Sequence, residues 1–305
     1  MPALRPVAFA ALFATCATAV AAQETDTPVI AVMSAFQPEW ISLQANLQGA
    51  KTQAINGVAF ITGQLEGKDV VLFLSGVSIV NAAMTTQLAL DHFNIDAIVF
   101  SGIAGGVDPS LHIGDVVVAS QWGQYLETIM ARETDGQFAV PSFLESKFPN
   151  FGMIFANETT VASGRGAPED HFWFPVDAEL LKIAEGVASE TDLAECNSDN
   201  ACLSEVPQVV VGGNGVSGSA FVDNSALREW IFGTFEAQVV DMESAAVAQV
   251  AWANQVPFIA FRSLSDLAGG GEGENEMGVF MSLAAENSAA LVQKFVAALP
   301  EQAAK

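Results

Sequence analysis

The sequence predicts a single α/β domain in which a mixed, largely parallel central sheet is flanked by helices. Short apolar runs rich in Val, Ile and Phe alternate with segments of helical periodicity along most of the chain. Alternation of this kind is typical of a sheet with helices on both faces. The sequence contains no internal repeat and no low-complexity tract that would indicate another architecture.

The expected elements alternate in the order that this fold requires. Apolar runs predict strands over residues 29–33, 58–63, 70–74, 97–100, 116–119, 209–211, 239–240 and 258–261. Helical spacing predicts helices over residues 37–47, 81–92, 244–253 and 278–298. Glycine-rich residues 101–106 follow a strand, and we expect a tight turn there whose backbone can approach a ligand closely.

Residues 124–206 differ from the rest of the chain because they are richer in aromatic, Pro and polar residues. We expect an insertion that serves as a lid or an interface element. It contains Cys196 and Cys202, which lie close together in a polar segment and predict a disulfide in an oxidising compartment. A metal site would need further soft ligands, and the three His residues are scattered, so we expect neither a metal nor a cofactor.

The first 22 residues have the order of a secretory signal peptide. Arg5 precedes an apolar stretch over residues 7–20, and small residues lead to cleavage after Ala21 or Ala22. A membrane anchor is the alternative, but the stretch is short and no stop-transfer pattern follows. Cys16 could accept a lipid, although the three residues before it make a poor lipobox. We therefore expect a periplasmic or secreted domain over residues 23–305.

The net charge of −24, from 35 acidic and 11 basic residues, excludes several classes of partner. Such a surface repels nucleic acids and anionic lipids, so we expect neither nucleic-acid binding nor membrane binding after cleavage. The same charge disfavours a nucleotide as substrate. A neutral nucleoside remains compatible, although solubility alone explains most of the charge.

Acidic residues follow two apolar strands near the end of the chain. Asp241 and Glu243 follow one strand and Asp266 follows the next. Ligands of α/β sheets bind outside the carboxyl ends of the strands, where two carboxylates can hold a sugar diol and protonate a leaving group. By this reasoning alone, solvated loop acids are an equally weighted alternative.

Four motifs together resemble those of the nucleoside phosphorylase and nucleosidase superfamily, in particular methylthioadenosine/S-adenosylhomocysteine nucleosidases. The resemblance covers residues 29–299, apart from the insertion. Its details are most similar to a secreted branch that includes plant bark storage proteins. The motifs are Gly102-Ile103-Ala104-Gly105-Gly106 with Ile113-Gly114-Asp115-Val116, Ser217-Gly218-Ser219-Ala220-Phe221, Val240-Asp241-Met242-Glu243-Ser244-Ala245-Ala246 and Arg262-Ser263-Leu264-Ser265-Asp266.

The resemblance implies roles for residues near the base and the sugar of a purine nucleoside. Asp266 matches the acid that protonates the purine N7, and a carboxylate at this position goes with adenine. Glu243 matches the carboxylate that binds the ribose hydroxyls, and Met242 matches the side chain that packs against the sugar. Phe221, next to Val222, matches the aromatic residue that stacks on the base. Ordinary core packing of Phe221 is the alternative.

The residues at the positions that activate water match the family pattern less well. Glu39 matches the base that activates water, with a helix-surface carboxylate as an equally weighted alternative. Gly102, Ile103 and Ala104 would line the substrate, but Ile103 replaces a hydroxyl residue that holds phosphate in phosphorylases. Phe100 likewise replaces an Arg.

The missing phosphate ligands favour hydrolysis of the N-glycosidic bond, because a dianion without cationic partners is poorly held. Phosphorolysis with Arg132 or Arg165 of the insertion as phosphate ligand remains an alternative. So does a non-catalytic nucleoside-binding or storage protein, since Ile103 departs from the family pattern. The family also implies a homo-oligomer, a dimer or trimer.

Overall fold

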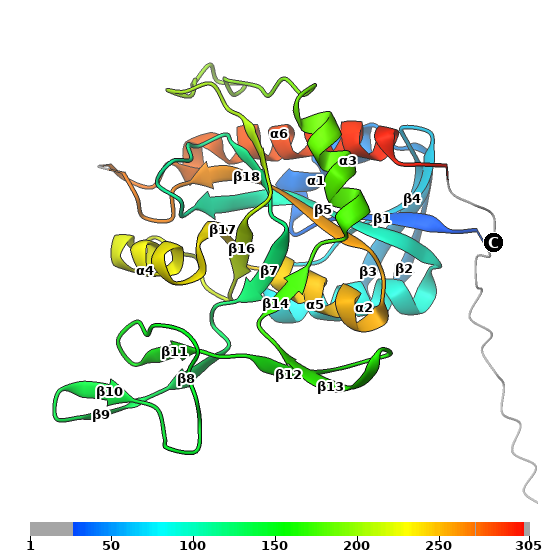
Figure 1. Ribbon diagram of the computed structural model, residues 1–305. Helices are drawn as coiled ribbons and strands as arrows, with labels where there is room; N and C mark the ends of the chain where they lie inside the picture. Colours follow the sequence, from blue (N-terminus) through cyan, green and yellow to red (C-terminus); the bar gives the residue numbers. More distant parts are fainter. Residues whose placement is uncertain (1–26, 272, 302–305) are drawn as a thin grey trace, which may run out of the picture.

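The computed structural model describes residues 27–271 and 273–301, so the expected signal peptide lies outside the described residues. Within them, a 12-stranded sheet forms the centre of the molecule (Figure 1). Its strands follow the order β14-β7-β16-β17-β5-β1-β4-β3-β2, and β18 pairs with β5 and β6, with β15 beyond β6. The pairs β1/β4, β1/β5, β16/β17 and β5/β18 are parallel, whereas β17/β5 and β2/β3 are antiparallel.

The elements of the sheet have the following bounds. The strands are β1 Val29–Ser34, β2 Gln48–Ile55, β3 Val58–Leu65, β4 Lys68–Leu74, β5 Ile95–Gly106, β6 Val116–Val118, β7 Gln121–Gln124, β14 Trp173–Pro175, β15 Val209–Val211, β16 Asn214–Ser217, β17 Ala237–Asp241 and β18 Phe258–Asp266. The helices are α1 Gln37–Ala45, α2 Ile79–His92, α3 Ala178–Ala188, α4 Ser225–Phe235, α5 Ser244–Asn254 and α6 Met277–Ala298.

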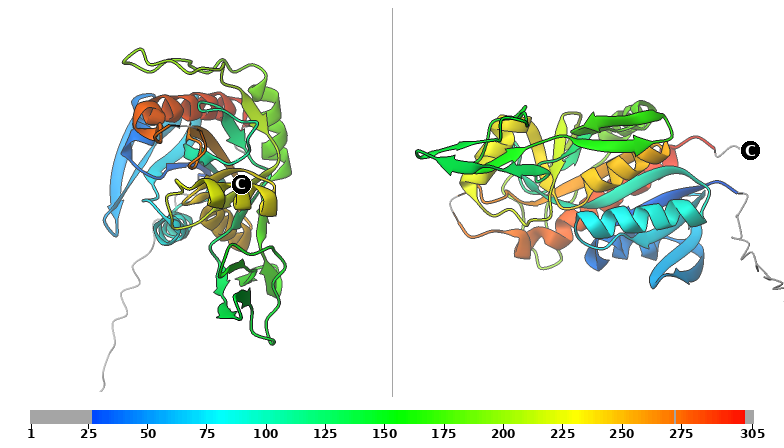
Figure 2. Two further views of the ribbon diagram at one scale, coloured as in Figure 1. Left: turned by 90° about the vertical axis from the view of Figure 1, so that its left-hand side faces the viewer. Right: turned by 90° about the horizontal axis from the view of Figure 1, so that it is seen from below.

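Helices cover both faces of the sheet, which confirms the predicted α/β class. Helices α1, α3 and α6 pack on one face, and α2 and α5 pack together on the other (Figures 1 and 2). The inner strands β1 and β18 are buried along their whole length because helices cover them from both sides. No helix among the described residues is long and apolar enough to cross a membrane.

The expected turn at residues 101–106 is wrong, because these residues continue β5 as far as Gly106. Glycine normally weakens a strand, and here it marks a close approach of side chains from neighbouring elements. A Cβ on Gly102 would lie 1.7 Å from Arg262 Nη1, and a Cβ on Gly106 would lie 2.9 Å from Leu264 Cδ1. The glycines therefore make room beside β18 and do not reverse the chain.

Much of the insertion extends away from the sheet as antiparallel hairpins (Figures 1 and 2). The hairpin strands are β8 Thr128–Met130, β9 Arg132–Thr134, β10 Gln137–Ala139, β11 Ile154–Ala156, β12 Thr159–Ser163 and β13 Gly166–His171. The chain then rejoins the sheet, since β14 pairs with β7. After α3, a disulfide joins Cys196 and Cys202 in a loop whose Asn197 side chain donates to the Val279 carbonyl of α6.

Candidate active site

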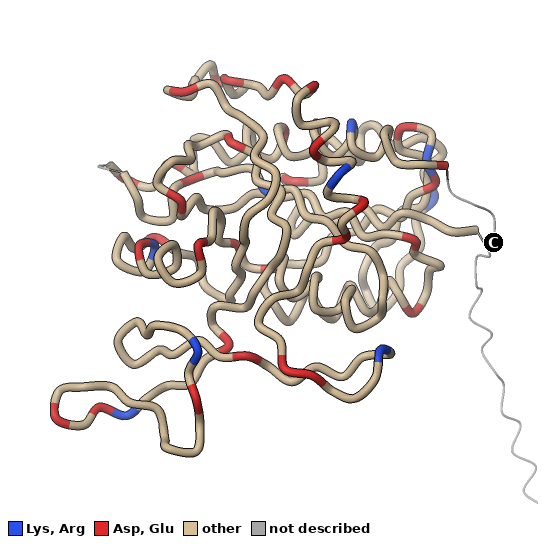
Figure 3. The backbone as a smooth tube through the Cα atoms, viewed as in Figure 1, with Lys and Arg blue, Asp and Glu red and all other residues tan. Residues whose placement is uncertain are grey.

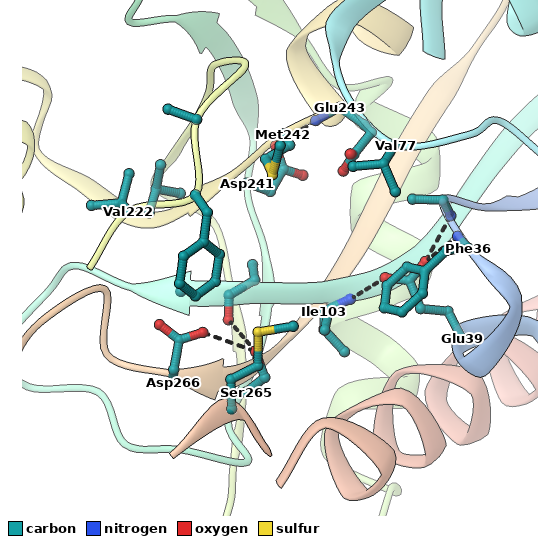
Figure 4. Close-up of a pocket in the computed structure, with 17 residues that line it drawn as sticks. Phe36, Glu39, Val77, Ile103, Val222, Asp241, Met242, Glu243, Ser265 and Asp266 are labelled. Atoms are coloured by element: carbon teal, nitrogen blue, oxygen red, sulfur yellow. Dashed lines mark hydrogen bonds between the residues drawn. The ribbon is translucent and has the colours of Figure 1, made fainter. Parts of the chain in front are cut away.

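A cavity of about 270 Å³ opens where several strands end (Figure 4). Strand β5 forms its floor, and the ends of β17 and β18 bring acidic side chains to it. Loops after β1, β4 and β16 and the first residue of α6 complete the wall. The lining residues are Ala35, Phe36, Glu39, Val77, Ile103, Ala104, Gly105, Ala220, Phe221, Val222, Val240, Asp241, Met242, Glu243, Ser265, Asp266 and Met277.

Asp266 is the last residue of β18 and is buried at the cavity wall. Its Oδ1 accepts hydrogen bonds from the Ala268 main-chain N–H at 2.8 Å and from Asn275 Nδ2 at 3.4 Å, and Ser265 Oγ donates to Oδ2 at 3.0 Å. Burial raises the pKa of Asp266, and these hydrogen bonds oppose the rise. A carboxyl group with a raised pKa is better suited to general-acid chemistry than one with an ordinary pKa.

Glu243 stands at the N-terminal end of α5 and is also buried. Its Oε1 accepts a hydrogen bond of 2.7 Å from the Ser78 main-chain N–H, and its Oε2 lies 3.8 Å from Arg262 Nη2. Burial and the neighbouring Asp241 raise the pKa of Glu243 to about 7, and Arg262 opposes that rise. Figure 4 shows the side chain near Val77, on the wall opposite Val222.

Glu39 lies in the first turn of α1 but is only 2% exposed, so the helix-surface alternative is wrong. Its Oε2 accepts main-chain N–H groups of Ala35 and Phe36 at 2.7 and 3.1 Å, and its Oε1 accepts that of Ile103 at 2.9 Å (Figure 4). Burial raises the pKa of Glu39, whereas the positive charge of Arg262 lowers it. The carboxylate is thus held rigidly between α1 and β5.

Arg262 is a fully buried cation behind the acidic wall, and no role was predicted for it. Its Nε lies 2.8 Å from Asp241 Oδ2 and donates to Ser244 Oγ at 2.9 Å, and its guanidinium lies 3.9 Å from the Phe100 ring centroid. Asp241 in turn accepts a short hydrogen bond from Ser217 Oγ. A charged residue inside an apolar strand was the available signal, because such a charge needs a buried partner.

The structure brings most of the predicted substrate contacts together. Phe221 lines the cavity and is 55% exposed, so core packing does not account for it. Val222, Met242, Ile103 and Ala104 also line the cavity. Gly102 is not among the lining residues, because it faces Arg262 and Glu39 behind β5, and its substrate contact stays a prediction.

The described residues of the cavity wall are acidic, apolar or, at Ser265, hydroxyl-bearing, and none has a basic side chain. Arg132 is exposed on β9, and Arg165 lies over the Trp252 ring at 5.4 Å from its centroid. The apolar contacts from Phe36, Val77 and Met277 were not predicted, since single apolar residues near loop ends carry no signal that separates them from core residues.

Comparison with known proteins shows which proteins this chain resembles in sequence and fold. The family model described as the phosphorylase superfamily matches residues 29–297. The chain is 31% identical over 268 residues to the 5'-methylthioadenosine/S-adenosylhomocysteine nucleosidase of Bacillus licheniformis, covering 88% of this chain and 97% of the relative. It is 32% identical over 270 residues to the same-named protein of Marinomonas sp., covering 88% and 98%. The crystal structure of such a nucleosidase from Colwellia psychrerythraea in complex with adenine has a TM-score of 0.69 at 27% identity, covering 91% of this chain and 97% of that one.

Proposed function

The chain belongs to the phosphorylase superfamily, and on that basis we propose that it hydrolyses the N-glycosidic bond of an adenine nucleoside, releasing the free base and the sugar. The observation that carries the proposal is the convergence of Asp266, Glu243 and Glu39, all buried, on one cavity. Burying three carboxyl groups is costly, and such burial is expected at an active site whose reaction uses their proton transfer.

Each carboxyl group takes one part of the reaction. Asp266, whose pKa is raised by burial, donates its proton to N7 of the purine, so that the base leaves neutral. Glu243 accepts hydrogen bonds from the ribose hydroxyls and stabilises the positive charge that develops on the sugar. Glu39 takes a proton from the water whose oxygen bonds to C1′ as the glycosidic bond breaks. Arg262 favours the ionised form of Glu39 that this step needs.

Water is favoured over phosphate as the attacking group because of the composition of the wall. A phosphate dianion requires cationic or hydroxyl partners, whereas Ile103 occupies this part of the wall and no described lining residue is basic. The hydroxyl among the lining residues, that of Ser265, donates to Asp266, and the remaining carboxylates would repel the dianion.

The test is adenine release from methylthioadenosine and adenosine, with and without phosphate. We expect release without phosphate, and a loss of at least about a hundredfold in the Asp266→Asn variant because the general acid is removed. Calorimetry with adenine should show that the variant still folds and binds. Phosphate-dependent release would instead indicate a phosphorylase. Tight binding without release by folded wild-type protein would indicate a nucleoside-binding or storage protein.

We also propose that the protein acts outside the cytoplasm, after removal of residues 1–22. The apolar leader and the Cys196–Cys202 disulfide support this location. Cell fractionation followed by mass spectrometry should find a mature chain that begins after Ala21 or Ala22. An uncleaved chain in the cytoplasm would contradict the proposal.

A homo-oligomer is the proposed assembly. Val80 and Met84 on α2 are large apolar side chains that are exposed in the single chain, and they support a contact between subunits. Light scattering on the purified protein should give the mass of a dimer or trimer. A monomer would contradict the assignment.

A further inference from the structure

Ser78 adopts a backbone conformation that only glycine adopts freely. It precedes α2 with φ 83° and ψ 158°, a region in which a Cβ atom is sterically unfavourable. Residues with side chains persist in this region where surrounding contacts hold them, and such residues cluster at functional sites. The contacts of Ser78 therefore indicate what the side chain contributes.

Ser78 donates two hydrogen bonds, to residues in two different segments of the chain. Its main-chain N–H donates to Glu243 Oε1 at 2.7 Å, and its hydroxyl donates to Ser219 Oγ at 2.7 Å. Ser219 lies in the loop after β16, which is far from Ser78 in sequence. One residue thus connects the start of α5 with a loop from another part of the sheet.

The two loops joined in this way form facing parts of the cavity wall. Val77, next to Ser78, and Val222, in the loop of Ser219, lie on opposite sides of the cavity (Figure 4). Ala220 and Phe221 of the same loop also line it. Within this loop Val222 is buried and packs in the core, whereas Phe221 is more than half exposed, so packing fixes the Phe221 side chain less firmly than its neighbour. The hydrogen bond between the two hydroxyl groups links the two sides at this end of the cavity.

We infer that Ser78 and Ser219 form a clasp that positions the carboxylate of Glu243 relative to the loop carrying Phe221, and so sets the spacing between the sugar and base subsites. The inference rests on the proposed function, in which these two residues contact the sugar and the base. Ser78 and Ser219 are positioning residues, because they act through Glu243 and Phe221. Their contribution belongs mainly to substrate binding and therefore to KM.

The experiment compares Ser78→Ala, Ser219→Ala and the double variant by steady-state kinetics. Loss of one hydrogen bond should raise KM about fivefold with a smaller change in kcat. The double variant should be no worse than either single variant, because both remove the same bond. Ser219→Thr retains a hydroxyl and should restore a KM near that of wild type.

Ser78→Gly separates positioning from stability. Glycine relieves the unfavourable backbone conformation, so this variant should melt at a higher temperature than Ser78→Ala and still show the raised KM. Glu236→Gly is the matched control, since Glu236 ends α4 with φ 48°, is exposed and does not line the cavity. It should gain stability with an unchanged KM.

The clasp is overturned if KM is unchanged in both single variants. It is also overturned if the increase in KM of the double variant equals the product of the two single increases. If folded wild-type protein releases no adenine, the proposed hydrolysis is wrong, but the clasp can still be tested. In that case the affinity for adenosine is measured by calorimetry for wild type, Ser78→Ala, Ser219→Ala and the double variant. Equal affinities would overturn the clasp in that case, and a coupled loss would support it.

Discussion

Arg262 and Gly102 show how single residues shape the acidic wall. Arg262 is wholly buried, and its pairing with Asp241 keeps a charged guanidinium inside the fold. The arginine fits because Gly102 has no side chain, since a Cβ there would lie 1.7 Å from Nη1 and 2.9 Å from Glu39 Oε1. A small residue on β5 thus determines where a cation on β18 can lie.

We expect Gly102→Ala to destabilise the protein strongly. The added methyl group forces Arg262 away from Asp241, and separating a buried ion pair costs about 3 kcal/mol or more. Urea unfolding followed by circular dichroism measures the loss. An unfolding free energy within about 0.5 kcal/mol of wild type would contradict this prediction, because only a harmless surface change has so small an effect.

The acidic residues of the site could be predicted from the sequence, whereas their partners could not. Asp266 and Glu243 follow apolar strands in recognisable motifs, and both lie at the cavity. Ser78 and Arg262 reach the site through contacts between segments far apart in the chain. Such contacts leave no periodic pattern in a single sequence.

The hydrophobic pattern predicted helices and strands that have a buried face, but it did not predict strands whose residues are almost all exposed. Helices α5 and α6 and strand β1 were predicted within a few residues. Strand β2 was missed because almost every residue in it is exposed, so apolar and polar positions do not alternate. Glycines in β5 indicated a turn, since their packing against Arg262 depends on tertiary contacts.

Helices α3 and α4, which were also missed, each contain a glycine whose replacement should stabilise the protein. A Cβ on Gly186 or Gly233 would meet no atom within 4 Å. Because alanine loses less backbone entropy than glycine in a helix, each Gly→Ala change should add about 0.5–1 kcal/mol to the unfolding free energy. Thermal and urea unfolding of Gly186→Ala and Gly233→Ala test this. Their activity should equal that of wild type, and a lower melting temperature would show that the helices are strained or incomplete at these positions.

Acidic residues occur along the whole described backbone, whereas Lys and Arg are few (Figure 3). The carboxyl groups that matter most for the pH dependence of stability are nevertheless buried ones. Burial raises the pKa values of Glu39, Glu243 and Asp266, so the folded state holds these protons to higher pH than the unfolded chain does. The stability that they contribute is therefore fully present below their ordinary pKa values and is lost as the pH rises through their folded values.

For Glu243 the window can be stated, because its pKa rises from 4.5 to about 7. We expect the unfolding free energy to fall between about pH 4.5 and pH 7 by up to about 3 kcal/mol from this group alone. Urea unfolding across this range should give a steeper fall for wild type than for Glu243→Gln, whose amide does not titrate. The surface acids are the same in both proteins, so the difference between the two curves isolates the buried carboxyl group. Parallel curves would mean that Glu243 titrates alike in the folded and unfolded chains, which its burial beside Asp241 argues against.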